Sequence, residues 1–424
     1  MSMKRSHASG HPFNPETLAL GYGYDPLLSE GSVKPPVFLT STFQFESAEE
    51  GKRFFELAYG LRQADEGETS GLIYSRLNNP NLQIFEERMA AWDEADTGAT
   101  FASGMAAIAT TLLAMLRPGD VLLRTSPVYG GTYYLCEHIL PSFGIKVHEV
   151  PAGSKAPEAM RALAAEVGWE HIRGIYVETP SNPDIVHTDI AAMKALALEI
   201  AASNGAEVPL MVDNTFLGPL FQRPVAHGAD LVLYSATKFI GGHSDLIAGV
   251  VTGRKAMMLK VLEMRTILGT MTTPFNGWLL QRSLETLSVR MRRQAKSARK
   301  LAELLKAHPK VLQVTYPGMT DEGDEQHAIW ERQCTGTGSL ISFEVEGGEA
   351  AAFRVLNHFE IARLAVSLGG TESLVEHPMT MTHSDMPQAY LERLGVRPGL
   401  IRMSVGLEHL SDLERDLEQA LSFA

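Results

Sequence analysis

Residues 230–242 read DLVLYSATKFIGG and form the most informative stretch of the chain. An apolar run predicts a strand, and this strand delivers a single lysine, Lys238, to a Gly-rich bend. Extended spacing places Ser235 and Thr237 on one side of the strand end. A lysine removed from bulk water can lose its proton and attack a carbonyl group. Taken alone, however, Lys238 is better explained as a surface lysine at the end of an edge strand.

Asp213 strengthens the catalytic interpretation of Lys238. It lies 25 residues earlier, at the end of the apolar strand PLMVDNTF. A carboxylate at this place can hold the protonated ring nitrogen of pyridoxal phosphate (PLP), which keeps the ring an electron sink. The alternative is an Asp-Asn pair that starts a turn, and without Lys238 this would be the better explanation.

A phosphate group needs a binding site of its own, and Ser103, Gly104 and Met105 open a helix predicted over 105–116. Small residues at a helix N-terminus leave backbone N–H groups free to bind an anion. The same residues are also common as simple caps, so the signal is weak by itself. No G-x-G-x-x-G follows an early strand, which counts against a dinucleotide.

The flanking sequence predicts an α/β protein with three parts. Residues 1–78 form an extended arm with one short helix at 48–57, residues 79–289 a large domain, and residues 290–424 a smaller α+β domain. In the large domain strands alternate with helices, which predicts a mostly parallel central sheet with both faces covered. Its strands are expected at 121–125, 146–150, 172–178, 210–214, 231–236 and 247–252, and its helices at 105–116, 132–140, 157–167 and 192–202. In the smaller domain we expect a helix at 290–307, strands at 339–346, 361–366 and 400–406, and a last helix with a capping box at 411–414.

Composition excludes several classes of function. The 424 residues carry 37 Lys and Arg against 50 Asp and Glu, and this net charge of −13 disfavours nucleic acid as a partner. Two cysteines, Cys136 and Cys334, indicate a reducing compartment, and no apolar stretch follows the basic N-terminus as a secretory signal requires. Residues 99–116 are long enough for a membrane span, but a buried helix explains them better. We therefore expect a cytoplasmic protein without a membrane partner.

Several motifs in one order carry a resemblance to a known family. They are YSRLNNPN (74–81), ASGMAA (102–107), VYGGTY (128–133), ETPSNP (178–183), VDNTF (212–216), SATKFIGGHSD (235–245), VSLGGTESLVEHPMTMTHS (366–384) and IRMSVGLE (401–408). From about Val33 to the C-terminus the chain resembles the Cys/Met-metabolism family of PLP-dependent enzymes, the group of methionine γ-lyase, cystathionine γ-lyase and cystathionine γ-synthase. The resemblance implies the aspartate-aminotransferase fold, also called fold type I, and PLP as the cofactor.

The resemblance also implies cofactor-binding roles. Lys238 matches the lysine that binds the cofactor covalently, and Asp213 matches the partner of the ring nitrogen. Tyr129 matches the tyrosine that stacks on the ring and serves as acid or base toward the leaving group, although from spacing alone it reads as a core aromatic. The remaining matches to cofactor ligands are Ser103, Gly104, Met105, Asn182, Ser235 and Thr237.

Two further pairs of matches concern the substrate and the partner subunit. Ser367 and Arg402 match the clamp on the substrate carboxylate, although Arg402 alone reads as a solvent-facing strand arginine. Tyr74 and Arg76 match a pair that reaches into the neighbouring subunit's site, but they also fit a half-exposed strand. The resemblance thus implies a homo-oligomer with shared sites, expected to be a homotetramer built as a dimer of dimers. His243, His377 and His383 lack metal-ligand spacing, and no metal is expected.

Departures from the family pattern bear on the substrate. Gly131 stands where methionine γ-lyases typically carry a cysteine, and Val366 where cystathionine-processing members typically carry a glutamate. Residues 60–71 are longer and more acidic than usual near the expected pocket entrance. The expected function is γ-elimination or γ-replacement on a sulfur-containing or O-acylhomoserine-type amino acid, most like methionine γ-lyase. The alternatives are γ-replacement on an O-acylhomoserine, which Gly131 keeps open, and a non-catalytic binding protein. The second is disfavoured by four intact residues: Lys238, Asp213, Tyr129 and Arg402.

Overall fold

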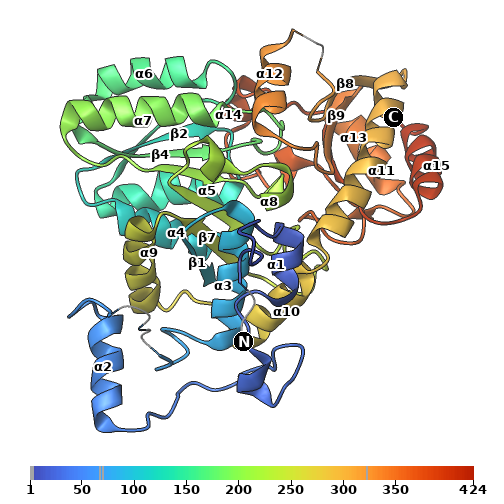
Figure 1. Ribbon diagram of the computed structural model, residues 1–424. Helices are drawn as coiled ribbons and strands as arrows, with labels where there is room; N and C mark the ends of the chain where they lie inside the picture. The colour runs from blue at the N-terminus through green and yellow to red at the C-terminus, as the bar shows by residue number, and fades with distance from the viewer. Residues whose placement is uncertain (1–3, 66–67, 69–70, 321–322) are drawn as a thin grey trace.

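The computed structural model describes residues 4–65, 68, 71–320 and 323–424. Its centre is a seven-stranded sheet of order β1-β7-β6-β5-β4-β2-β3 (Figure 1). Only β7 runs antiparallel to its neighbours in this sheet, so the predicted mostly parallel α/β architecture is confirmed. The strands are β1 (Thr97–Phe101), β2 (Val121–Ser126), β3 (Lys146–Pro151), β4 (Ile172–Glu178), β5 (Leu210–Asp213), β6 (Leu231–Ser235) and β7 (Gly249–Gly253).

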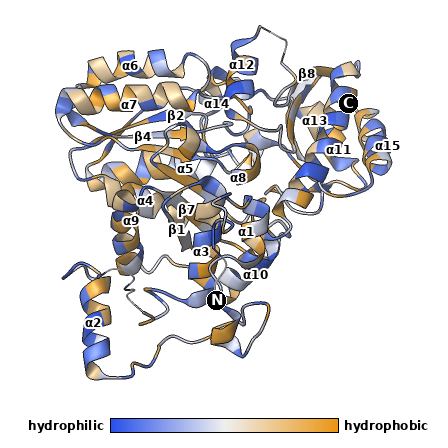
Figure 2. Cartoon of the chain, viewed as in Figure 1, coloured by the Kyte–Doolittle hydropathy of each residue, from blue (hydrophilic) through white to orange (hydrophobic). Residues whose placement is uncertain are grey.

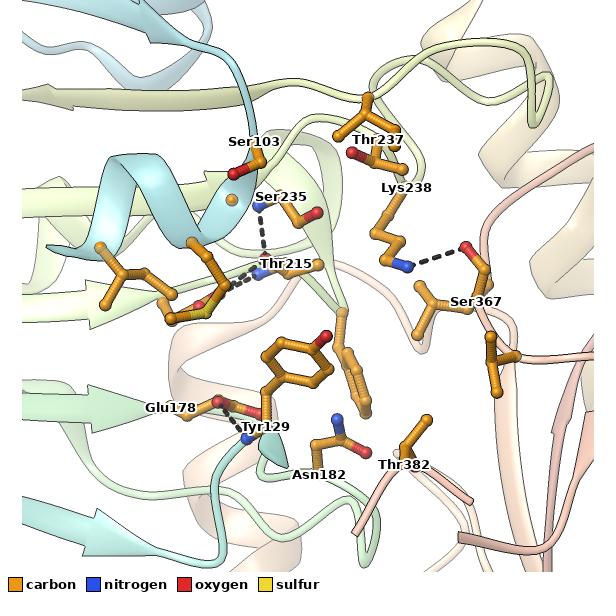
Figure 3. Close-up of a pocket in the computed structure, with 18 of the residues that line it drawn as sticks. Ser103, Tyr129, Glu178, Asn182, Thr215, Ser235, Thr237, Lys238, Ser367 and Thr382 are labelled. Atoms are coloured by element: carbon orange, nitrogen blue, oxygen red, sulfur yellow. Dashed lines mark hydrogen bonds between the residues drawn. The ribbon is translucent and has the colours of Figure 1, made fainter. Parts of the chain in front are cut away.

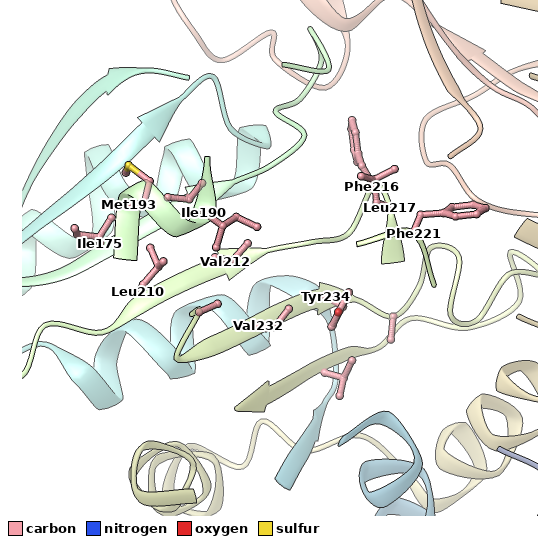
Figure 4. Packing of buried hydrophobic residues seen from close by; sticks show 14 of the residues in the cluster. Ile175, Ile190, Met193, Leu210, Val212, Phe216, Leu217, Phe221, Val232 and Tyr234 are labelled. Atoms are coloured by element: carbon pink, nitrogen blue, oxygen red, sulfur yellow. The ribbon is translucent and has the colours of Figure 1, made fainter. Parts of the chain in front are cut away.

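Helices cover both faces of this sheet, which explains why its central strands are apolar on both sides. One face carries α3 (Pro80–Asp93), α6 (Ala156–Val167) and α7 (Ile190–Asn204), and Figure 4 shows Ile190 and Met193 of α7 beside Val212 of β5. The other face carries α4 (Gly104–Met115) and α9 (Lys255–Leu268). The short helices α5 (Gly130–Tyr134) and α8 (Gly218–Phe221) and the longer α10 (Pro274–Leu284) complete this part.

The C-terminal part has its own five-stranded sheet of order β10-β11-β12-β9-β8. The strands are β8 (Val311–Thr315), β9 (Leu340–Val345), β10 (Arg363–Leu364), β11 (Leu374–Glu376) and β12 (Leu400–Ser404). A separate hydrophobic cluster joins this sheet to α11 (Leu287–Ala307), α13 (Gly348–Asn357) and α15 (Leu410–Leu421). Two shorter helices, α12 (Glu325–Gln333) and α14 (Gln388–Arg393), hydrogen-bond across to the large sheet's loops and strands.

Two local predictions are wrong, and a third is confirmed with a change of helix type. The capping box at 411–414 fails because α15 begins at Leu410 with His409 as its N-cap, which leaves Ser411 inside the first turn. The strand expected at 361–366 shrinks to the two residues of β10, since the chain turns at Ser367 with φ +95°. The helix expected at 132–140 is α5 followed by a π-helical turn at Leu135–Ile139.

The N-terminal arm includes α1 (Pro15–Gly21) and α2 (Ala48–Ala58). Its first part packs on the large domain, where Leu18, Ala19 and Tyr24 are buried, and later in the arm the Pro35 carbonyl and Arg76 also hydrogen-bond to the large domain. By contrast α2 stands away from the sheet (Figure 1). This helix carries both hydrophobic and hydrophilic residues (Figure 2). The arm also exposes apolar side chains at Leu27, Leu28, Val33 and Leu39. Across the described ranges, no helix is both long and apolar enough to span a membrane.

Candidate active site

One pocket of about 280 Å³ lies where the carboxyl ends of β4, β5 and β6 meet loops of the C-terminal domain (Figure 3). This edge is where open α/β sheets bind their ligands. Most of the predicted site residues line it: Ser103, Gly104, Met105, Tyr129, Asn182, Asp213, Ser235, Thr237, Lys238, Val366, Ser367 and Arg402. The sheet topology therefore brings together side chains that are up to 299 positions apart in sequence, from Ser103 to Arg402.

Lys238 follows an interior strand, because β6 pairs with β5 on one side and β7 on the other. The edge-strand explanation is therefore wrong. Its Nζ donates a hydrogen bond to Ser367 Oγ at 2.8 Å, which links the large domain to the C-terminal domain. Burial and the positive charge of Arg402 together lower the pKa of Lys238 to about 8, while Glu376 opposes the shift. A lysine of this kind is partly neutral near neutral pH and can act as nucleophile or base.

Asp213 ends β5 inside the protein and is held by three donors. Its Oδ1 accepts the Thr215 N–H at 3.0 Å and the Thr215 hydroxyl at 2.6 Å, and its Oδ2 accepts the Tyr176 hydroxyl at 3.1 Å. Glu178 lies directly beside it on β4, and its Oε2 accepts a hydrogen bond from the N–H of Tyr129 at 2.9 Å. Burial and the neighbouring Asp213 charge raise the pKa of Glu178 well above its usual value. Burial also raises the pKa of Asp213, but its hydrogen bonds from Thr215 and Tyr176 oppose the shift, so Asp213 is the carboxyl favoured as the anion.

The start of α4 provides free backbone donors beside Lys238. Ser103 is the N-cap, and its Oγ accepts the Ala106 N–H at 2.9 Å. The N–H groups of Gly104 and Met105 belong to the first turn, which has no intrahelical acceptors for them. A side chain at Gly104 would place its Cβ 2.8 Å from the Ser235 Cβ, so only glycine fits this contact. The result is a small, donor-rich concavity of the kind that binds phosphate.

Arg402 lies in the middle of β12 with a 3 % exposed side chain, so the solvent-facing explanation is wrong. Ile401 and Met403, its neighbours in the strand, join the domain core on the opposite face. The guanidinium donates from Nη1 to Asn182 Oδ1 at 2.9 Å and from Nη2 to the Ser367 carbonyl at 3.3 Å. Its Nη2 also forms an ion pair with Glu376 at 2.9 Å.

Tyr129 and Gly131 flank the start of α5. The ring of Tyr129 points into the pocket and is 41 % exposed, which contradicts the core-aromatic explanation (Figure 3). Gly131 lies behind it, where an added Cβ would come within 2.7 Å of Tyr129 Cε1 and 3.0 Å of Met105 Sδ. On the other side of the pocket Val366 is 55 % exposed.

Tyr74 and Arg76 are not among the described residues that line this pocket. Arg76 donates from Nη1 to the Thr266 carbonyl at 2.5 Å, and Tyr74 remains 41 % exposed. Both side chains belong to the arm, outside the pocket of their own chain.

Several pocket residues escaped the sequence analysis: Ile108, Glu178, Thr215, Phe216, Ile247, Leu368 and Thr382. A signal for some of them was present. Glu178 and Thr215 lie inside the motifs ETPSNP and VDNTF, and Ile108 follows Gly104 by one helical turn. Leu368 lies inside the motif at 366–384, whereas no residue pattern distinguishes Ile247 from ordinary apolar positions.

A buried carboxylate, a helix N-terminus and a lysine with a lowered pKa, gathered at the carboxyl edge of a mostly parallel sheet, define a PLP-dependent enzyme of fold type I. The family model described as Cys/Met metabolism PLP-dependent enzyme matches residues 16–422, and the chain belongs to this family. The match begins upstream of Val33, where the resemblance was expected to begin. PLP is therefore the cofactor of this enzyme.

Named relatives cover almost the whole chain. It is 39 % identical over 411 residues to an L-methionine gamma-lyase of Pseudomonas deceptionensis, covering 96 % of this chain and 97 % of the relative. It is 36 % identical to a cystathionine gamma-lyase of Sus scrofa, covering 100 % and 98 % of the two chains. The solved cystathionine gamma synthase of Xanthomonas oryzae pv. oryzae, in complex with aminoacrylate and cysteine, superposes with a TM-score of 0.84 at 34 % identity over 97 % and 98 % of the chains.

Proposed function

We propose that this enzyme catalyses γ-elimination or γ-replacement on a sulfur-containing or O-acylhomoserine-type amino acid, most like an L-methionine γ-lyase. The observation that carries the proposal is the bridge made by Ser367. Its hydroxyl binds Lys238 and its carbonyl binds Arg402, so a base and a carboxylate-binding group face one pocket. Several relatives of this chain are named L-methionine gamma-lyase, which supports the proposed substrate class.

The pocket fits PLP at three points. Gly104 leaves a concavity at the start of α4 for the phosphate, with Ser103, Met105, Ser235 and Thr237 around it. Asp213 is a carboxylate for the ring nitrogen, and Lys238 an amine for the aldehyde. Asn182 lies on the side of the ring hydroxyl in this assignment. When bound, PLP supplies an electron sink for the bond broken at Cα.

The side chains of this chain carry the proton transfers. Arg402 binds the α-carboxylate of the substrate and thereby fixes its Cα, since a guanidinium matches a carboxylate in two bonds. Lys238 Nζ would then remove the proton from Cα, release it, and as the same base accept the proton that leaves Cβ. Tyr129 Oη donates a proton to the group that departs from Cγ. Asp213 holds the proton on the ring nitrogen throughout.

Gly131 supports a second candidate, γ-replacement on an O-acylhomoserine. It brings no thiol to the place where methionine γ-lyases typically carry one, and a cystathionine gamma synthase is among the similar solved structures. In both candidates Val366 contacts the distal end of the substrate. Its apolar side chain favours an uncharged tail over the ammonium group of cystathionine.

The arm suggests how subunits assemble. Tyr74 and Arg76 lie outside their own pocket, and α2 and the exposed apolar residues of the arm lack a covering layer within the described chain. We therefore include in the proposal a homotetramer, built as a dimer of dimers, in which these two residues complete the neighbouring pocket. The proposed parts of each subunit are the arm at 1–78, the large domain at 79–289 and the C-terminal domain at 290–424. We place the enzyme in the cytoplasm, as a component of methionine metabolism and transsulfuration.

A substrate panel tests the proposal. Specificity constants would be measured for methionine, cystathionine, cysteine and O-acylhomoserines, each with and without a thiol or a carbon nucleophile. We expect 2-oxo acid and ammonia from methionine without an added nucleophile. A replacement product from O-acylhomoserine at a much higher specificity constant would favour the second candidate. Absence of turnover with every Cγ-substituted substrate would refute both.

A further inference from the structure

Glu376 is a buried carboxylate beside the pocket that the proposed chemistry does not yet use. It lies on β11 directly opposite Arg402 on β12, and directly opposed residues of an antiparallel pair point to the same face. Glu376 Oε1 and Arg402 Nη2 are 2.9 Å apart, with side-chain exposures of 1 % and 3 %. We propose that Glu376 is a positioning residue whose carboxylate holds the guanidinium of Arg402 in the orientation that binds the substrate carboxylate.

The positioning effect follows from the shape of the guanidinium. It is planar and carries five N–H donors in a rigid fork, so fixing two of them fixes the direction of the others. Glu376 holds Nη2 and Asn182 holds Nη1, while Arg402 still lines the pocket. A preorganised guanidinium loses less freedom when a ligand binds, which increases affinity. Without Glu376 the arginine would be a buried charge that lacks its carboxylate partner.

Glu376 also orders a second group at the pocket. Thr382, which lines the pocket, donates its hydroxyl to the same Oε1 at 2.9 Å. The carbonyl of Thr382 in turn lies so close to Gly130 that a side chain there would overlap it. One carboxylate oxygen therefore ties Arg402 to the loop that packs against the Tyr129 turn.

The second carboxylate oxygen of Glu376, Oε2, allows a test in which only this atom is replaced. Within the described residues, Oε2 is buried and has no hydrogen-bond partner. A glutamine can therefore keep its Oε1 on Arg402 and place its amide nitrogen at Oε2 without losing a bond. E376Q preserves the positioning contact, whereas E376A removes it.

The experiment measures how holoenzymes bind glycine and methylamine, from the change in visible absorption on titration. Glycine is methylamine plus a carboxylate, so the difference between the two ligands isolates the carboxylate contact. We expect E376A to raise the Kd of glycine about tenfold to a hundredfold, the range for losing a charge-assisted hydrogen bond. The Kd of methylamine should change less than threefold, and E376Q should stay within about threefold of the unmodified enzyme for both ligands.

A matched control is E344Q in the same sheet. Glu344 pairs at 3.3 Å with Arg397, whose side chain is 59 % exposed, so this variant removes a glutamate charge far from the proposed role. Its glycine Kd should change less than twofold. If E376A does not fold, E376D replaces it, since its shorter side chain withdraws the carboxylate and should raise the glycine Kd at least fivefold.

Three results would overturn the positioning role. They are a glycine Kd in E376A (or in E376D, should E376A not fold) within twofold of the unmodified enzyme, an equal loss for methylamine, or E376Q binding glycine more than threefold tighter. The inference rests on the proposed role of Arg402 but not on the reaction at Cγ. An enzyme that turns over none of the substrate panel, yet shows the expected glycine shifts, would refute the proposed activity and support the role of Glu376.

Discussion

The lowered pKa of Lys238 leads to a quantitative prediction about cofactor capture. At pH 7 an amine with a pKa of about 8 is about 9 % neutral, whereas a lysine at the ordinary value of 10.5 is only about 0.03 % neutral. Only the neutral amine attacks the aldehyde. The rate at which apoenzyme captures PLP should therefore rise about fiftyfold between pH 6 and pH 8, and less than about twofold from there to pH 10.

The assay traps the captured cofactor with borohydride and counts modified Lys238 by mass spectrometry at short times. The control is a lysine with blocked α-amino and α-carboxyl groups, whose side chain has the ordinary pKa. Its rate of reaction with PLP in the same buffers corrects for the ionisation of PLP itself. Replacing Arg402 by Gln removes a positive charge from the surroundings of Lys238 and leaves Glu376 unpaired, and both changes raise the lysine pKa. The pH at which the capture rate levels off should then be higher. A capture rate that keeps rising tenfold per pH unit up to pH 10 in the unmodified enzyme would refute the reasoning, because Lys238 would then titrate like a solvated lysine.

Four further outcomes follow from the same geometry. Lys238→Ala should abolish turnover yet keep PLP bound noncovalently, which dialysis and absorption spectra would show; normal turnover would contradict the assignment. Mixing inactive Arg76→Ala with inactive Lys238→Ala under demonstrated subunit exchange should restore activity, and no recovery would count against shared sites. Gly131→Cys should lower kcat, because its Cβ would displace the Tyr129 ring. A rise in methionine cleavage would contradict this, because it would mean that the ring moves aside without loss of activity. Val366→Glu should raise the specificity constant for cystathionine relative to methionine by about tenfold to a hundredfold, since it restores a charge-assisted hydrogen bond; an unchanged ranking would place the distal contact elsewhere.

Much of the fold could be predicted because its signals are local. Strands β2, β4, β5 and β6 are largely buried on both faces and rich in apolar residues, and the structure places these four strands and the edge strand β3 within one residue of the expected bounds. The errors fall where tertiary contacts, and not the local sequence, determine the secondary structure. Residues 361–366 have the composition of a strand, but the turn at Ser367 serves the pocket and leaves only two residues for β10. β1 was not predicted, because Thr97–Phe101 has little apolar character of its own and pairs only with β7.

For the site, sequence identified residue types but not their surroundings. Lys238 and Asp213 could be named from their strand ends, yet neither position shows that β6 is interior or that Tyr176 binds the carboxylate of Asp213. Motifs supplied the remaining matches. These matches include Tyr74 and Arg76, which do not line the pocket of their own chain. Their expected role therefore depends on a second subunit.

The contact of Glu376 with Arg402 could not be predicted from the sequence. It is part of the motif SLVEHP, where a glutamate before a histidine and a proline has no evident task. Its partner Arg402 lies 26 residues later, across a helical turn and α14, and only the register of β11 against β12 sets the two side by side. Register depends on how both strands pack against the domain core, where Val375 and Met403 are buried. Since a one-residue slip of either strand would turn its own charged side chain toward that core, the apolar alternation that builds the sheet also determines which carboxylate meets the substrate-binding arginine.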